Sequence, residues 1–213
     1  LVRVFQSDAR SVVVRIDAET LGKMEHENIE STVKRWLSID WDPKSAIRIA
    51  TALDPRVALF IKNGGGRFLR SSTFYEDFVK TVCTINTNWA STRRMVSSLV
   101  NRLGNGVFPT PVEVIEHGED FLRQKLRFGF RARVVAELSR QLLSQGIVDC
   151  QGNLVDTTPR FEDLLGLRGI GQYSASHLMM LTHDFGCIPI DTEVAHYCRE
   201  HYDVEPEDIE TFF

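Results

Sequence analysis

The 213-residue sequence lacks long apolar runs, internal repeats and low-complexity tracts. No stretch approaches the roughly 20 consecutive apolar residues that a membrane-spanning helix needs, which argues against a membrane protein. No signal-peptide pattern opens the sequence, although it starts at Leu1 without methionine, so a removed leader stays open. Hydrophobic residues make up 43% of the chain and charged residues 25%, which is typical of a soluble globular protein.

Cysteine and histidine are few and scattered. The four cysteines include no Cys-x-x-Cys pair: Cys83, Cys150, Cys187 and Cys198. They indicate buried thiols in a reducing compartment rather than disulfides or a zinc site. Three histidines lack the spacing of metal ligands and are expected to face solvent or to cap helices: His177, His183 and His196.

The net charge of −4 does not by itself indicate nucleic-acid binding. Residues 121–140, however, contain one acid, Glu137, and six cations: Arg123, Lys125, Arg127, Arg131, Arg133 and Arg140. A basic face on an acidic protein suits an enzyme that must bind DNA without indiscriminate attraction to it. The same charges also fit an ordinary solvated helix face, and both interpretations stay open.

Hydrophobic periodicity predicts a mainly α fold. Residues 1–20 alternate with period two, which predicts one or two strands with a turn at residues 7–10. Helical patterns follow, with starts at Asp42-Pro43 and Asp54-Pro55, over 25–37, 74–85, 89–103, 110–115, 119–126 and 131–145. We therefore expect a partial N-terminal α+β domain over residues 1–40 and a helical body over 41–213. The body is expected to be truncated within a helix that starts at Pro206.

The most distinctive stretch is Thr158–Asp191. Thr158 and Pro159 predict a helix start, and the Gly-rich segment 166–171 predicts a tight hairpin whose Leu167 and Ile170 enter the core. A second helix is expected from Gln172 to about 184–186, followed by an extended Cys187–Ile190. Asp191 precedes another helix, 192–201. Glycines allow close approach to a ligand, and outward-facing amides at a helix start form a phosphate site.

This pattern resembles the helix-hairpin-helix Gly/Pro-Asp DNA glycosylases, through Leu167-Arg168-Gly169-Ile170-Gly171 and Pro189-Ile190-Asp191. The resemblance covers roughly residues 40–213 and is closest to the branch of 3-methyladenine DNA glycosylase II and 8-oxoguanine DNA glycosylase. Two further stretches match the oxoguanine enzymes: Cys83-Thr84-Ile85-Asn86-Thr87-Asn88 and Phe128-Gly129-Phe130-Arg131-Ala132-Arg133. It implies a two-lobed helical glycosylase fold with a small β-containing N-terminal region.

The resemblance also implies roles for individual residues. Asp191 would be the catalytic carboxylate, Asn86 would fill the space of the extruded nucleotide, and Phe130 would be the wedge with Arg131 facing the orphaned base. Tyr173 and Trp89 would line the base pocket. Further DNA contacts would come from Arg133, Arg168, Gly169, Gly171 and Gln172. Main-chain carbonyls would hold a monovalent cation: Leu165, Leu167 and Ile170. No iron–sulfur cluster is expected, because no cysteine follows Cys198.

Tyr173 stands where bifunctional relatives carry a nucleophilic lysine, and a phenol cannot form a Schiff base. This predicts a monofunctional hydrolase that leaves an abasic site. Cationic alkylated purines stack on electron-rich rings, which favours alkylated substrates, whereas the Asn86 and Phe130-Arg131 matches favour oxidised guanine. That conflict stays open at this point.

Several of these residues also have a purely structural interpretation. Asp191 could be an ordinary N-cap, Asn86 a helix-breaking cap, and Phe130 or Tyr173 core aromatics. Two rival functions follow: a non-catalytic helix-hairpin-helix DNA-binding module, and a glycosylase/lyase with an amine such as Lys80 or Lys125. The expected partner is damaged double-stranded DNA, bound by a monomer that is intracellular and not attached to a membrane.

Overall fold

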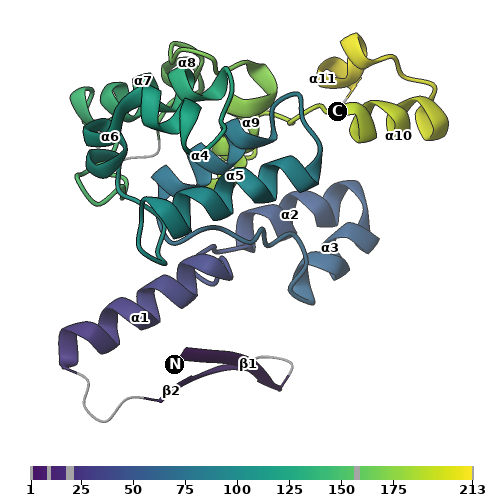
Figure 1. Ribbon diagram of the computed structural model, residues 1–213. Helices are drawn as coiled ribbons and strands as arrows, with labels where there is room; N and C mark the ends of the chain where they lie inside the picture. The colour runs from purple at the N-terminus through teal and green to yellow at the C-terminus, as the bar shows by residue number, and fades with distance from the viewer. Residues whose placement is uncertain (1, 9–10, 18–21, 156–158, 213) are drawn as a thin grey trace. The chain divides into compact units, whose positions relative to one another are not determined.

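The computed structural model describes residues 2–8, 11–17, 22–155 and 159–212. The chain forms two compact units, Leu1–Ser72 and Thr73–Phe213. Figure 1 shows the succession of elements along the chain. This division differs from the boundary expected at residue 40, since the first unit also takes in two helices beyond that residue.

The first unit begins with a two-stranded antiparallel sheet. Strand β1 (Val2–Asp8) pairs with β2 (Ser11–Ile16), with Val4 opposite Val14, as the alternating pattern predicts. Three helices follow: α1 (Lys23–Trp36), α2 (Lys44–Leu53) and α3 (Pro55–Lys62). Asp54 caps α3 by accepting a hydrogen bond from the Arg56 amide, 2.8 Å away, which confirms the predicted start at Asp54-Pro55.

The second unit is helical. Its elements are α4 (Phe74–Thr84), α5 (Trp89–Arg102), α6 (Pro111–Gln124), α7 (Arg131–Ser144), α8 (Phe161–Leu165), α9 (Gln172–Leu181), α10 (Thr192–Tyr202), the short 3-10 turn η1 (Pro206–Asp208) and α11 (Ile209–Phe212). Helix α4 packs on α5, α7 and α9. Its Phe74, Phe78 and Val82 are almost wholly buried, so α4 is the centre of the hydrophobic core.

Side-chain caps fix several helix starts. Thr73 accepts a hydrogen bond from the Glu76 amide at 3.1 Å, and Asn88 accepts one from the Ser91 amide at 2.9 Å. Thr110 and Glu113 form a capping box at α6. Gly118 interrupts α6 with a φ of 73°, which accounts for the two helices predicted over residues 110–126.

Two predicted boundaries around the hairpin are wrong. Helix α8 begins at Phe161, so Pro159 precedes the helix, because Asp163 accepts hydrogen bonds from the Arg160 amide and guanidinium and fixes Arg160 as the N-cap. Thr158 lies outside the described residues. Helix α9 ends at Leu181, short of residues 184–186, since Asp184 accepts a hydrogen bond from the Gly186 amide and forms a turn there.

None of the helices that the structure describes is long and apolar enough to cross a membrane.

Candidate active site and nucleic-acid interface

The hairpin between α8 and α9 adopts the predicted form. Leu167 and Ile170 are buried, and the Ile170 amide donates a hydrogen bond to the Leu167 carbonyl at 3.2 Å. Gly169 has a φ of +81°, and a Cβ there would lie 2.9 Å from Cγ1 of Val134 on α7. A side chain at residue 169 would therefore be strained and would clash with α7.

Gly171 differs from Gly169, because a Cβ at residue 171 would meet nothing within 4 Å. It is the N-cap of α9, and Gln172, the first residue of that helix, is exposed. The first amides of α9 have no partner one turn earlier, so this open helix start suits a phosphate oxygen.

The two arginines next to the hairpin, Arg133 and Arg168, share a single acidic partner. Arg168 Nε lies 2.9 Å from one oxygen of Glu137, and Arg133 Nε lies 2.9 Å from the other. The hydrogen bond from Arg133, assisted by the charges of Arg168 and Arg140, lowers the pKa of Glu137. Arg168 is thus held against α7 next to Arg133, and one carboxylate balances the charge of these two arginines in part.

The predicted catalytic Asp191 is exposed and caps α10. Its Oδ1 accepts a hydrogen bond from the Val194 amide at 2.8 Å, so the N-cap interpretation is correct as far as it goes. Its charge also acts on two residues of α9: it raises the pKa of Tyr173 after the larger effect of burial, and it opposes the lowering of the His177 pKa. Asp191 is therefore an exposed carboxylate whose charge acts on Tyr173 and His177.

Tyr173 and His177 form a pair on one face of α9. Their rings stack with centroids 6.0 Å apart and an interplanar angle of 19°. Burial lowers the pKa of His177, against the charges of Asp77 and Asp191. The expectation that His177 faces solvent is wrong: it is half-buried against Tyr173. Its position four residues after Tyr173 on a helix is the signal that could have placed it.

The turns before α5 and α7 present the next predicted residues. Asn86 is exposed and left-handed, with a φ of 47°, a conformation that asparagine tolerates better than most residues. Phe130 is 56% exposed at the start of α7 and is not a core aromatic. Trp89, the first residue of α5, is 69% exposed, and no contact among the described residues joins it to Tyr173. Its place in a base pocket stays a prediction.

Arg131 connects these two turns. It is only 7% exposed, its guanidinium carbon lies 4.4 Å from the centre of the Phe130 ring, and it donates a hydrogen bond to the Ile85 carbonyl. Burial lowers the Arg131 pKa, and burial also raises the pKa of the neighbouring Cys83 thiol to about 12. Arg131 thus fixes the wedge turn against the Asn86 turn.

A cavity of about 580 Å³ opens beside these turns, between α5 and the segment that joins α6 to α7. We call it the basic cavity. Its lining includes Thr87, Ser91, Met95, Ser98, Leu126, Phe128 and Gly129, and five cations: Arg94, Arg102, Lys125, Arg127 and Arg131. No acidic side chain belongs to this lining, so the cavity favours an anion.

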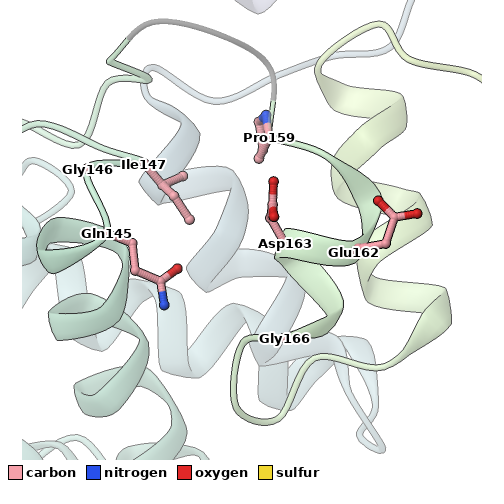
Figure 2. A pocket seen from close by; sticks show the side chains of 7 residues that line it. All are labelled: Gln145, Gly146, Ile147, Pro159, Glu162, Asp163 and Gly166. Atoms are coloured by element: carbon pink, nitrogen blue, oxygen red, sulfur yellow. The ribbon is translucent and has the colours of Figure 1, made fainter.

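A second cavity, of about 590 Å³, lies between the end of α7 and α8 (Figure 2). Its lining contains two acids, Glu162 and Asp163, together with Gln145, Gly146, Ile147, Pro159 and Gly166. Asp163 pairs with Arg160 at 2.8 Å, which lowers the pKa of that carboxyl. Its acids make this cavity unsuited to a nucleic-acid phosphate.

The predicted cation site concerns main-chain atoms. The carbonyls of Leu165, Leu167 and Ile170 belong to the hairpin, and that of Leu167 already accepts the Ile170 hydrogen bond. Among the described side chains, no group of three or more His, Cys, Asp or Glu residues could hold a metal ion. The hairpin cation and the expected lack of an iron–sulfur cluster stay predictions.

Known proteins share this architecture. No family model matches the chain. It is 26% identical over 154 residues to an N-glycosylase/DNA lyase of Saccharomyces cerevisiae, a match that covers 61% of the chain and spans about 40% of the relative's length. Among solved structures, MBOgg1 in complex with a low-affinity DNA ligand superimposes with a TM-score of 0.71 at 18% identity, over 99% of this chain and 74% of that one.

Two other structures match equally broadly. The Clostridium acetobutylicum 8-oxoguanine glycosylase/lyase, solved with double-stranded DNA containing cytosine opposite 8-oxoG, gives a TM-score of 0.68 at 19% identity, covering 99% of this chain and 74% of that one. A 3-methyladenine DNA-glycosylase from Archaeoglobus fulgidus gives 0.68 at 17% identity, covering 99% and 75%. The chain therefore has the mainly helical fold of these DNA glycosylase structures, as the sequence predicted.

Proposed function

We infer that the chain is a base-excision-repair DNA glycosylase, which removes a damaged purine from double-stranded DNA. The observation that supports this most is the placement of Asp191: an exposed carboxylate, fixed by its cap on α10, whose charge reaches Tyr173 on the helix that starts at the hairpin. The proposed enzyme acts inside the cell as a monomer, with damaged DNA as its partner.

A target base must leave the duplex before it reaches such a carboxylate, at a cost of a few kcal/mol for unstacking. The surface offers parts suited to that task. The open start of α9 at Gly171 can bind a phosphate, the exposed Phe130 ring can stack beside the vacated position, and Asn86 can fill it. Arg131 keeps the last two in a fixed relation.

Departure of the base leaves positive charge on the sugar. The Asp191 carboxylate would stabilise this oxocarbenium-like state and orient or deprotonate the attacking water. The N-cap hydrogen bond from Val194 engages Oδ1 and fixes the orientation of the carboxylate without neutralising it.

The residue at the lysine position separates two versions of this function. Tyr173 has no amine, which favours simple hydrolysis, whereas the yeast and Clostridium relatives are glycosylase/lyases. A lyase needs an amine from another residue. Lys80 lies 2.7 Å from Glu76, while Lys125 lines the basic cavity. Borohydride trapping on damaged DNA decides this, because only an imine leaves a covalent adduct.

The comparisons change the order of the substrate candidates. Oxidised guanine now comes first, since the turns at Asn86 and Phe130 resemble the oxoguanine enzymes and the Clostridium relative is an 8-oxoguanine glycosylase/lyase. Alkylated purines come second, on the strength of the half-buried Tyr173 ring and the Archaeoglobus enzyme. Excision from a panel of duplexes with oxidised, alkylated and deaminated bases tests the order.

Asp191→Asn tests the function itself. Asparagine is also a good N-cap, so the variant should fold and bind DNA while base release falls roughly 10²- to 10⁴-fold. Glu193→Gln, which changes an exposed acid in the first turn of the same helix, is the matched control and should keep its activity. Base release by Asp191→Asn at the wild-type rate would show that Asp191 is not the catalytic carboxylate. No release by the wild type on any duplex would leave the DNA-binding module as the better interpretation.

A further inference from the structure

We propose that the basic cavity binds phosphates of the DNA strand opposite the damaged base. This proposal rests on the proposed function in that it assumes a duplex held by the hairpin. It assigns a second strand-binding site to side chains of α5 and of the segment before α7: Arg94, Arg102, Lys125 and Arg127.

The cations of the cavity lack acidic partners. Among the residues that the structure describes, no carboxylate forms an ion pair with any of its five cations. Other cations of the same region are paired: Arg123 with Glu119, and Arg133 and Arg168 with Glu137. Five like charges around one concavity repel each other, and an anion placed among them relieves that repulsion.

A buried donor points to the same kind of ligand. Arg131 is only 7% exposed, and its Nε atom is buried. This atom has no hydrogen-bond partner within the described part of the chain. Buried N–H groups are nearly always paired in folded proteins, so an unpaired one beside a cavity indicates a missing acceptor. The acceptor that suits a guanidinium N–H without a partner is an oxyanion.

The shape of the wall fits a strand rather than a single ion. Arg94, Ser98 and Arg102 follow one another on α5 at intervals of four residues, so the row is about 12 Å long at 1.5 Å per residue. One strand advances about 3.4 Å per nucleotide along the duplex axis, so a row of this length parallel to that axis spans three or four nucleotides. The hydroxyls of Thr87, Ser91 and Ser98 add the neutral donors that commonly contact DNA backbones.

The hairpin and the basic cavity meet α7 at different points along its length. The hairpin contacts α7 at Val134, Glu137 and Gln141, whereas the cavity contacts it at Arg131. The two sites are therefore about 5 to 15 Å apart along the helix axis. Phe130 projects from the end of α7 that borders the cavity. We therefore assign the hairpin amides to the damaged strand and the cavity, as a separate site, to its complement.

The test uses Arg94→Gln/Arg102→Gln against a control pair, Arg93→Gln/Arg123→Gln, which removes the same charge from exposed positions outside the lining. Binding to an undamaged duplex is measured by fluorescence anisotropy over a range of salt. Removing one phosphate contact should reduce the slope of log K against log salt by about 0.9, so the slope should fall by nearly two for the cavity pair and change little for the control pair. Equal changes in the two pairs would overturn the proposal.

Neutral linkages identify the strand. Methylphosphonates in the strand opposite the lesion should weaken binding of the wild type but not add to the defect of the cavity pair. Methylphosphonates in the damaged strand should weaken both proteins alike. The reverse pattern would overturn the proposal. The proposal would also be wrong if inorganic phosphate bound through Arg94 and Arg102 but did not compete with the duplex.

The outcome separates the two proposals, because no step of this test needs base excision. If the cavity pair lowers the salt slope but the wild type excises no base from any duplex, the proposed catalytic function is wrong and the strand-binding site is supported. If excision is complete and requires Asp191 but the two pairs have equal salt slopes, the catalytic function is supported and the strand-binding site is wrong. Thermal unfolding of both pairs should match the wild type, since all four arginines are exposed.

Discussion

The hairpin and the basic cavity both lie against α7, but they would bind anions by different physical means. At the hairpin the arginines are balanced by Glu137, and the available donors are backbone amides at an open helix start. In the cavity the donors are side-chain charges without acidic partners among the described residues. A backbone site depends on shape and tolerates changes of charge, whereas a side-chain site depends on charge and tolerates changes of shape.

The largest expected effect comes from breaking the shape of the hairpin. Gly169→Ala places a side chain at φ +81° and 2.9 Å from Val134, so the free energy of unfolding should fall by about 2 to 4 kcal/mol. Urea denaturation measures it. The control Gly171→Ala meets open space and should keep its stability within about 0.5 kcal/mol while weakening DNA binding. Equal stability losses in the two variants would contradict this account of the hairpin.

A smaller effect should come from leaving the arginines next to the hairpin without an acidic partner, as the cations of the cavity are. Glu137→Gln removes the partner of Arg133 and Arg168, which would then face DNA unbalanced. DNA affinity at low salt should rise several-fold, and the salt slope should steepen by up to about two contacts. Anisotropy titrations against salt check this. Glu119→Gln, which releases only the surface cation Arg123, serves as the control, and a fall in affinity would contradict the prediction.

The smallest effect concerns pH. The helix that follows the hairpin, α9, contains His177, whose pKa is lowered by burial. The unfolded chain then takes up the proton first, so this contribution to stability is fully present above the ordinary pKa of 6.5 and is lost as pH falls below it. Unfolding midpoints at about pH 7.5 and 5.5, on either side of that pKa, measure the decrease.

His177→Gln should unfold with a smaller difference between these two pH values than the wild type. His196→Gln is the control, because His196 is exposed beside Glu200 and should leave the difference unchanged. DNA binding through the cavity should not follow this titration. A His177→Gln variant whose difference equals that of the wild type would contradict this account of His177.

Much of the fold followed from local sequence patterns. Period-two alternation predicted the β1–β2 pair, and Asp54-Pro55 marked the start of α3, because a cap bonds to backbone only two or three residues away. The hairpin was also predictable, since Gly169 is required by the backbone itself. The start of α8 was missed because the Arg160–Asp163 contacts outweighed the Thr158-Pro159 signal.

The sequence by itself determined the helical class, the hairpin and the acid at residue 191, since each depends on residues close together in the chain. Only the tertiary structure decided which arginines have partners. Arg168 reaches Glu137 from a separate element, and Arg102 on α5 donates to the carbonyl of Lys125, 23 residues away, so no local pattern pairs them. The charge of a surface depends on such distant contacts, because a cation next to a carboxylate attracts DNA far less than one without.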